Sequence, residues 1–229
     1  MPANPAKQLS QKFQKRIEKS IAHHNELLLT VQGKLRQAAL ETMLSEQFVF
    51  NVIVLWEVFL SDLIIQYLAM SPTHYTRTLR GRLMQSVREK FGHPTAQFLR
   101  FTPPTQISLA QTRAMVDPKE FNITITSADV LTRRANELLE AKYARLFTLN
   151  PEFAQFVNYI IAARNYLAHR SKSSRKQLKS AVGVLEGPNL PFAGSVSKVG
   201  SYLKARDAQN QTRAIVIARR LIVLAEILA

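Results

Sequence analysis

The sequence predicts an all-α protein, a helical bundle formed by a single domain over residues 1–229. Long segments carry apolar residues at steps of three and four, the spacing that places them on one face of an α-helix. The 229 residues include only 7 Gly and 10 Pro, and a sandwich or barrel of many short strands needs more turn residues. Hydrophobic residues make up 46% of the chain, which excludes a mostly disordered protein and is enough for a sizeable core.

The first predicted helix covers residues 7–36. Its apolar stripe consists of Leu9, Phe13, Ile17, Ile21, Leu28, Val31 and Leu35. His24 lies on the same stripe, and we interpret it as a polar residue partly buried in a packed helix. A metal site with the adjacent His23 is not expected, because neighbouring residues on a helix point in different directions.

The second predicted helix, residues 48–70, is apolar almost all round, as a central core helix or a membrane span would be. Glu57 and Asp62 argue against the span, since each acid in mid-membrane costs about 2.5 kcal/mol or more. In a largely enclosed helix the carboxylate of Glu57 needs a cationic or hydrogen-bonding partner. We predict an arginine as this partner, with Glu57 as a supporting carboxylate.

Residues 75–91 are predicted to form a basic helix, weakened by Gly81. Two long loops are predicted, over residues 92–126 and 183–200, the first of them with short helical turns. Pro recurs in the first and both Gly and Pro in the second, and neither segment has a sustained apolar period. Loops of this length in a compact domain are usually functional or mobile.

The C-terminal half contains three further predicted helices. One covers residues 127–149, and the last covers residues 206–228. Between them, the segment Asn150-Pro151-Glu152 is the expected start of a helix over residues 151–170. Asn at the N-cap accepts from a free amide, Pro lacks an amide hydrogen, and Glu interacts favourably with the helix dipole.

The charge balance favours an anionic partner. The chain has 31 Lys and Arg against 16 Asp and Glu, which gives a net charge of +15 and a pI of about 10.4. Such a protein attracts phosphate backbones by counterion release, although an anionic membrane surface or simple solubility would also explain the charge. The absence of Cys excludes disulfides, thiolate metal sites and cysteine nucleophiles. The N-terminus carries charges throughout and lacks the apolar run of a signal peptide, so we expect a cytoplasmic protein.

Arg164 interrupts the apolar face of the predicted helix over residues 151–170. It lies one turn after Ile160, where an apolar side chain is expected. A structural arginine with its stem along the core and its guanidinium at the rim would be an ordinary explanation. However, Asn165 and His169 are four residues apart and share one edge of the helix next to Arg164. The three polar side chains are therefore predicted to converge on a groove near the helix end.

The segment RNYLAHR, which contains these three residues, resembles the motif of the HEPN superfamily (higher-eukaryote and prokaryote nucleotide-binding domain). In that motif Arg, a polar residue and His stand at the end of a late helix. Two other Arg-to-His spacings, in residues 16–23 and 88–93, lack the polar residue after Arg. The Trp56-Glu57 pair on a long apolar helix before the motif, and an apolar helix after it, are similar to several HEPN branches. The resemblance covers most of the chain but not the two predicted loops.

The resemblance implies a metal-independent endoribonuclease that acts as a homodimer and needs no cofactor, with the motif of each protomer facing its mate. It implies that Arg164, Asn165 and His169 are catalytic. HEPN nucleases often serve as toxins or antiviral defence effectors, so an antitoxin or a defence-system partner protein is a further expectation. Ser171 stands where toxins silenced by a nucleotidyltransferase carry Tyr, which argues against that type of antitoxin.

The same residue types suit RNA cleavage without a metal ion. In this reaction the 2′-OH attacks the adjacent phosphorus, which requires proton transfer near neutral pH and a cation for the phosphorane. A free imidazole has a pKa of about 6.5, so a histidine such as His169 suits proton transfer. Arg164 stays protonated and its planar fork can hold two phosphate oxygens, while Asn165 would orient His169 or a phosphate oxygen.

A basic segment follows the motif. No acidic residue occurs between Glu152 and Glu186, whereas basic residues are frequent there. We predict that RNA binds at Arg170, Lys172, Arg175, Lys176 and Lys179. The alternative for this segment is a solvated charged loop without a ligand.

Two other functions are compatible with the sequence. A non-catalytic RNA-binding HEPN module would use the same basic surface and would hold phosphate with the motif. A DNA-binding helical regulator is permitted by the charge. It receives little support, because the N-terminal region predicts one long helix and not two short helices joined by a tight turn.

Overall fold

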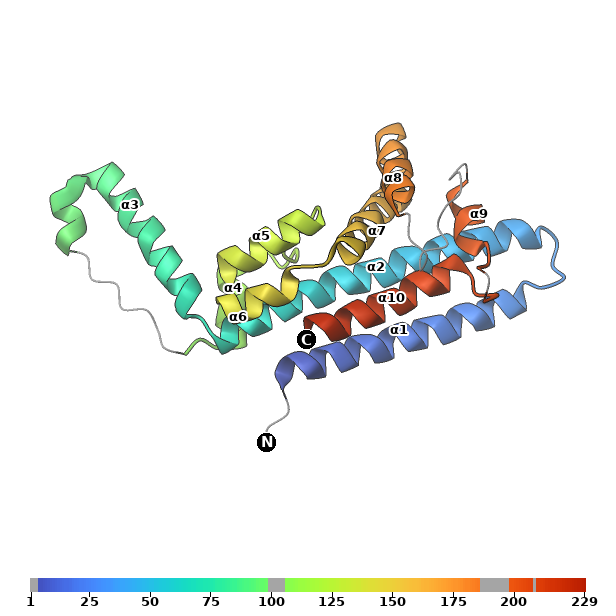
Figure 1. Ribbon diagram of the computed structural model, residues 1–229, viewed down its shortest axis with the longest axis horizontal. Helices are drawn as coiled ribbons and strands as arrows, with labels where there is room; N and C mark the ends of the chain where they lie inside the picture. Colours follow the sequence, from blue (N-terminus) through green and yellow to red (C-terminus); the bar gives the residue numbers. More distant parts are fainter. Residues whose placement is uncertain (1–3, 99–105, 186–197, 208) are drawn as a thin grey trace.

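The computed structural model describes residues 4–98, 106–185, 198–207 and 209–229, and every regular element in these ranges is helical. The predicted all-α class is therefore confirmed. Helices α1 (Pro5–Thr30), α2 (Gln37–Met70) and α10 (Arg213–Leu228) lie side by side along the long axis of the molecule (Figure 1). The remaining helices pack on or project from this group of three.

Helix α2 is the centre of the core. Trp56 is 1% exposed, and its ring lies 5.8 Å from that of Phe13 on α1 and 5.5 Å from that of Phe59 on α2. By length and composition α2 would be able to cross a membrane, and among the described helices it alone meets this criterion. Most of its apolar stretch is buried against the rest of the chain, as in the core helix of a packed domain.

The boundary between the first two helices differs from the prediction. Helix α1 ends at Thr30 and α2 already begins at Gln37. Gly33 (φ 70°) and Arg36 (φ 62°) have left-handed backbone conformations, which end the first helix and reverse the chain. Leu35 consequently lies in the turn and is 89% exposed, although its spacing had placed it on the apolar stripe.

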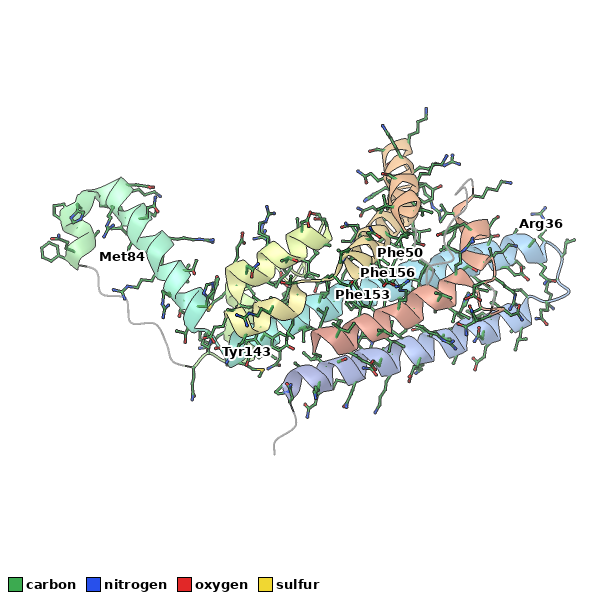
Figure 2. The ribbon with its side chains drawn as sticks, viewed as in Figure 1. Arg36, Phe50, Met84, Tyr143, Phe153 and Phe156 are labelled. Carbon is green, nitrogen blue, oxygen red and sulfur yellow. The ribbon has the colours of Figure 1, made fainter. Side chains whose placement is uncertain are left out.

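The prediction of a loop over residues 92–126 is wrong in part. Helix α3 (Thr73–Phe98) continues beyond a kink at Gly92 (φ 82°), and α4 covers Leu109–Val116. Pro94 follows the kink immediately, so it sits in the first turn of the restarted helix, where its missing amide hydrogen is harmless. Figure 1 shows α3 projecting from the body, and Figure 2 shows Met84 on this arm. Pro103 and Pro104 lie outside the described residues.

The single helix predicted over residues 127–149 is interrupted. The chain forms α5 (Ala128–Leu138), α6 (Ala141–Ala144) and the 3₁₀ turn η1 (Arg145–Phe147). The hydroxyl of Thr132 donates to the carbonyl oxygen of Phe147 at 2.8 Å, which holds the folded-back segment against α5. Leu139 and Phe147 are both buried, so burial of these side chains in one core overrides the local preference for a continuous helix.

The predicted start of the next helix is confirmed. Helix α7 covers Pro151–His169, and the side-chain oxygen of Asn150 accepts from the amide of Phe153 at 2.8 Å. The basic segment after it is a helix and not a loop. Helix α8 (Lys172–Val184) begins at the N-cap Ser171, whose hydroxyl oxygen accepts from the amide of Ser174 at 3.1 Å.

The C-terminal segment also begins later than predicted. Helix α10 starts at Arg213 and not at residue 206, because the side chain of Thr212 caps it and Arg206 forms an isolated antiparallel bridge with Thr212. The second predicted loop, residues 183–200, is bounded by the end of α8 and by the short helix α9 (Val199–Lys204). Its residues 186–197 lie outside the described part of the chain.

His24 is buried as the sequence predicted, and this gives a pH-dependent stability. Its ring stacks on Phe48 at 4.3 Å, and burial lowers the pKa of His24 to about 4. The unfolded chain binds a proton near the ordinary pKa of 6.5, so stability falls as the pH drops from about 6.5 to 4. This one group contributes a loss of about 3 kcal/mol at most.

We expect His24→Phe, which keeps a ring against Phe48, to reduce the loss of unfolding free energy between pH 6.5 and pH 4 by about that amount. Urea denaturation at a series of pH values measures the effect. His23→Phe, at an exposed histidine next to it, is the control and should keep the wild-type slope. A His24→Phe profile parallel to that of the wild type would contradict the assignment.

Candidate functional site

Arg164 on α7 lies against Glu57 on α2, as predicted for the partner of this carboxylate. Arg164 Nε is 3.4 Å from Glu57 Oε1, and the two side chains are 34% and 32% exposed. Arg164 also donates from its guanidinium to Asn165 Oδ1 at 3.4 Å. Burial raises the pKa of the Glu57 carboxyl, and the neighbouring Arg164 charge opposes this shift. The pair therefore joins the centre of the core helix to the motif helix.

A pocket of about 300 Å³ opens beside this ion pair. Its wall on α2 includes Trp56 and Glu57, and its wall on α7 includes Arg164 and Asn165. Residues 121–126 line the pocket as a segment without regular secondary structure, which we call the strap. The strap belongs to the region predicted as a loop, and its place over the motif was not predicted.

Polar side chains of the two helices hold the strap. The amide of Ile123 donates to Ser61 Oγ on α2 at 3.1 Å. Two residues after the strap, the amide of Ala128 at the start of α5 donates to Asn158 Oδ1 on α7 at 2.8 Å. Ser61 is buried, so this hydrogen bond also satisfies a hydroxyl inside the core. Polar residues on otherwise apolar helix faces are the sequence signal for such anchoring, but the sequence does not say what they bind.

His169 lies apart from Arg164. It is the last residue of α7 and is exposed. Five residues along a helix correspond to a rotation of about 140° about its axis, so the two side chains leave α7 in different directions. Within the described ranges, no hydrogen bond or ion pair joins His169 to either Arg164 or Glu57. A single chain thus brings Arg164, Asn165 and Glu57 together, while His169, one turn after Asn165, leaves α7 in a different direction from Arg164.

The predicted RNA-binding residues are placed on a helical surface. Lys172, Arg175, Lys176 and Lys179 are all exposed, and their spacing of three, one and three residues puts them on one face of α8. We call these residues the α8 basic face. Another side of α8 buries Ser174, Leu178 and Val182. The sequence predicted the charges, but not the helix that aligns them.

Arg170 has different surroundings from the rest of the predicted set. It forms the hinge between α7 and α8 in a left-handed conformation (φ 51°). Its guanidinium lies 2.6 Å from a carboxylate oxygen of Glu46 on α2 and 5.4 Å from the ring centre of Tyr166. The side chain is therefore already engaged in contacts that fix the hinge.

A second depression lies between α7 and α8 and has a volume of about 520 Å³. The side-chain amides of Gln155, Asn158, Asn165 and Gln177 line it. Asn165, Ile161 and Thr126 line both depressions, so the two adjoin across α7. None of these amides except Asn165 was identified from the sequence, because glutamine and asparagine are common on exposed helix faces.

In the described part of the chain, no group of three His, Asp or Glu side chains is arranged to hold a metal ion. Comparison of the chain with protein-family models, with curated proteins and with solved structures finds no match.

Proposed function

We propose that the chain binds RNA and cleaves it as a metal-independent endoribonuclease. The observation that carries this proposal is the α8 basic face, which begins three residues after an exposed histidine at the end of α7. Phosphate groups bound along α8 would bring the sugar-phosphate chain past the imidazole of His169. The net charge of +15 supports the same class of ligand.

In the proposed reaction, His169 accepts the proton of the ribose 2′-OH as this oxygen attacks the adjacent phosphorus. The P–O5′ bond breaks, the 5′ oxygen takes up a proton, and the products carry a 2′,3′-cyclic phosphate and a 5′-OH. A guanidinium near the phosphorane would stabilise the charge that develops on its oxygens. Arg164 supplies this group and Asn165 orients it, in line with the hydrogen bond between them.

The proposal includes a homodimer. Arg164 and His169 leave α7 in directions about 140° apart, so one chain does not direct both at the same phosphate. A two-fold pair in which Arg164 of one protomer faces His169 of the other would complete the site. The HEPN motif resemblance points to the same arrangement. It also points to a toxin or antiviral defence effector acting in the cytoplasm, restrained by an antitoxin or a defence-system partner protein.

A second candidate is a non-catalytic RNA-binding module. Its support is the pairing of Arg164 with Glu57, since a guanidinium held at 3.4 Å by a carboxylate serves the packing of α7 on α2. In that case the α8 basic face binds phosphate, and His169 takes no part in a reaction. The two candidates differ in what happens to the RNA after binding.

Incubation of the purified chain with mixed single-stranded RNAs in EDTA, followed by analysis of the RNA ends, tests the proposal. The endoribonuclease predicts fragments with 2′,3′-cyclic phosphate and 5′-OH ends. Salt-sensitive binding of RNA that stays intact would support the non-catalytic module. Light scattering on the same sample measures the mass, and the chain of 25.9 kDa is expected at twice this value. A monomer that cuts RNA would contradict the shared site.

A further inference from the structure

The groove between α7 and α8 is uncharged, which is unusual on a chain of this net charge. Its polar lining consists of the amides of Gln155, Asn158, Asn165 and Gln177 with two hydroxyl groups, and the rest is apolar. No Lys, Arg, Asp or Glu lines it. The groove therefore offers no cationic side chain that would bind a phosphate group or an acidic peptide. The lining suits a neutral group that has both hydrogen-bonding edges and an apolar surface.

Some of the amide groups have free hydrogen-bonding capacity. Asn158 uses its oxygen to accept from the amide of Ala128, and this leaves its NH₂ as a donor. The side-chain amides of Gln155 and Gln177 make no hydrogen bond with any other described residue. A side-chain amide offers a donor and an acceptor side by side, which matches the edge of a nucleobase. The apolar contribution of Ile161 and Ala162 suits the face of a base.

The position of the groove connects it with the cleavage residues. Asn158, Ala162, Asn165 and His169 follow one another at steps of four, three and four, so they lie along one face of α7. His169 is therefore one turn beyond the groove, about 6 Å along the helix axis from Asn165. On the α8 side, Lys176 of the basic face lies one turn before Ser180 of the groove lining. A strand whose phosphates contact the basic face would have a base within reach of the groove.

We propose that this amide-lined groove binds an unpaired nucleobase of the RNA and so selects single-stranded RNA as the substrate. A base that is paired in a duplex has its edge occupied and does not reach such a groove. The inference rests on the proposed function, because it requires that RNA binds at the α8 basic face. The groove would contact a base of the RNA, whereas the α8 basic face would contact only its phosphates.

Binding of two uncleavable oligonucleotides tests the inference. One is a fluorescently labelled single-stranded 2′-O-methyl RNA, and the other has the same length and the same phosphates but abasic sugars. We expect the wild-type chain to bind the base-containing strand about tenfold more tightly by fluorescence anisotropy. The double variant Gln155→Met and Gln177→Met keeps side-chain volume but removes the amides, and should lose most of this preference.

The matched control is Gln8→Met, an exposed glutamine on α1, which should keep the wild-type preference. Affinity for the abasic strand should be the same for all three proteins within about twofold, since it depends on phosphate contacts. Equal affinity of the wild type for both strands, or an unchanged preference in the double variant, would overturn the nucleobase groove while leaving RNA binding intact. Failure of the wild type to bind either strand would overturn the proposed function as well.

Discussion

Replacement of His169 by alanine should slow RNA cleavage by about 10²- to 10⁴-fold, the usual contribution of a general base. His169 is exposed at the end of α7 and its imidazole makes no hydrogen bond in the described part of the chain, so its removal should leave the fold and the affinity for RNA unchanged. The rate is measured on labelled single-stranded RNA in EDTA, with RNA binding measured separately. Circular dichroism checks that the helical content is retained.

The control for this variant is His23→Ala, an exposed histidine on α1 far along the chain from the motif. It should cleave at the wild-type rate. Undiminished cleavage by His169→Ala would exclude the imidazole from the reaction. A parallel loss of RNA binding and cleavage would show that His169 acts in binding and not in proton transfer.

Replacement of Trp56 by alanine should lower the free energy of unfolding by about 3–5 kcal/mol. The indole is 1% exposed and contacts the aromatic rings of Phe13 and Phe59, so its loss leaves a cavity where α1 packs on α2. Urea denaturation followed by circular dichroism measures the change. Trp56→Phe, which keeps part of the ring volume, should lose less than the alanine variant.

Phe91→Ala is the matched control, because Phe91 lies on the projecting α3 arm and is 66% exposed. It should change the free energy of unfolding by less than about 0.5 kcal/mol. Similar losses for Trp56→Ala and Phe91→Ala would show that the aromatic cluster around α2 is not the main source of stability.

The parts of the fold that depend on local chemistry were predictable from the sequence. The start of α7 follows from Asn150 and Pro151, which act within one turn of the backbone, and the structure places it there. The partner of Glu57 was also predictable, because a half-buried carboxylate requires a cation or hydrogen-bond donors, and Arg164 was the polar interruption of a neighbouring apolar helix.

The parts that depend on tertiary contacts were not predictable in the same way. In helix α8 only a few apolar residues, such as Leu178 and Val182, recur at helical spacing among many charged residues. The sequence alone therefore did not predict the helix, which packs against α7 in the structure. The strap lacks any regular period, and it is fixed by the hydrogen bond from Ile123 to Ser61 on α2 and, just after its end, by the hydrogen bond from Ala128 to Asn158 on α7. No local pattern in residues 121–126 specifies those partners.

The candidate site, like the fold, was predictable from the sequence only in part. The sequence identified Arg164 and Asn165, which the structure joins by a hydrogen bond. The expectation that His169 converges with Arg164 in one chain neglected the rotation of about 140° over the five residues between them, although Asn165 and His169 do share one edge of α7. The amides of Gln155 and Gln177 gave no signal, since their relation to His169 arises from the pairing of α7 with α8.

The hinge at Arg170 restricts the movement of α8 relative to the core. A left-handed residue other than glycine costs about 1–2 kcal/mol, and here the contacts of Arg170 with Glu46 and Tyr166 offset that cost. Glu46 belongs to α2, so the outward helix is tethered directly to the core. Its lysines and arginine are thus preorganised, and under the proposed function less freedom of the helix would be lost on binding RNA.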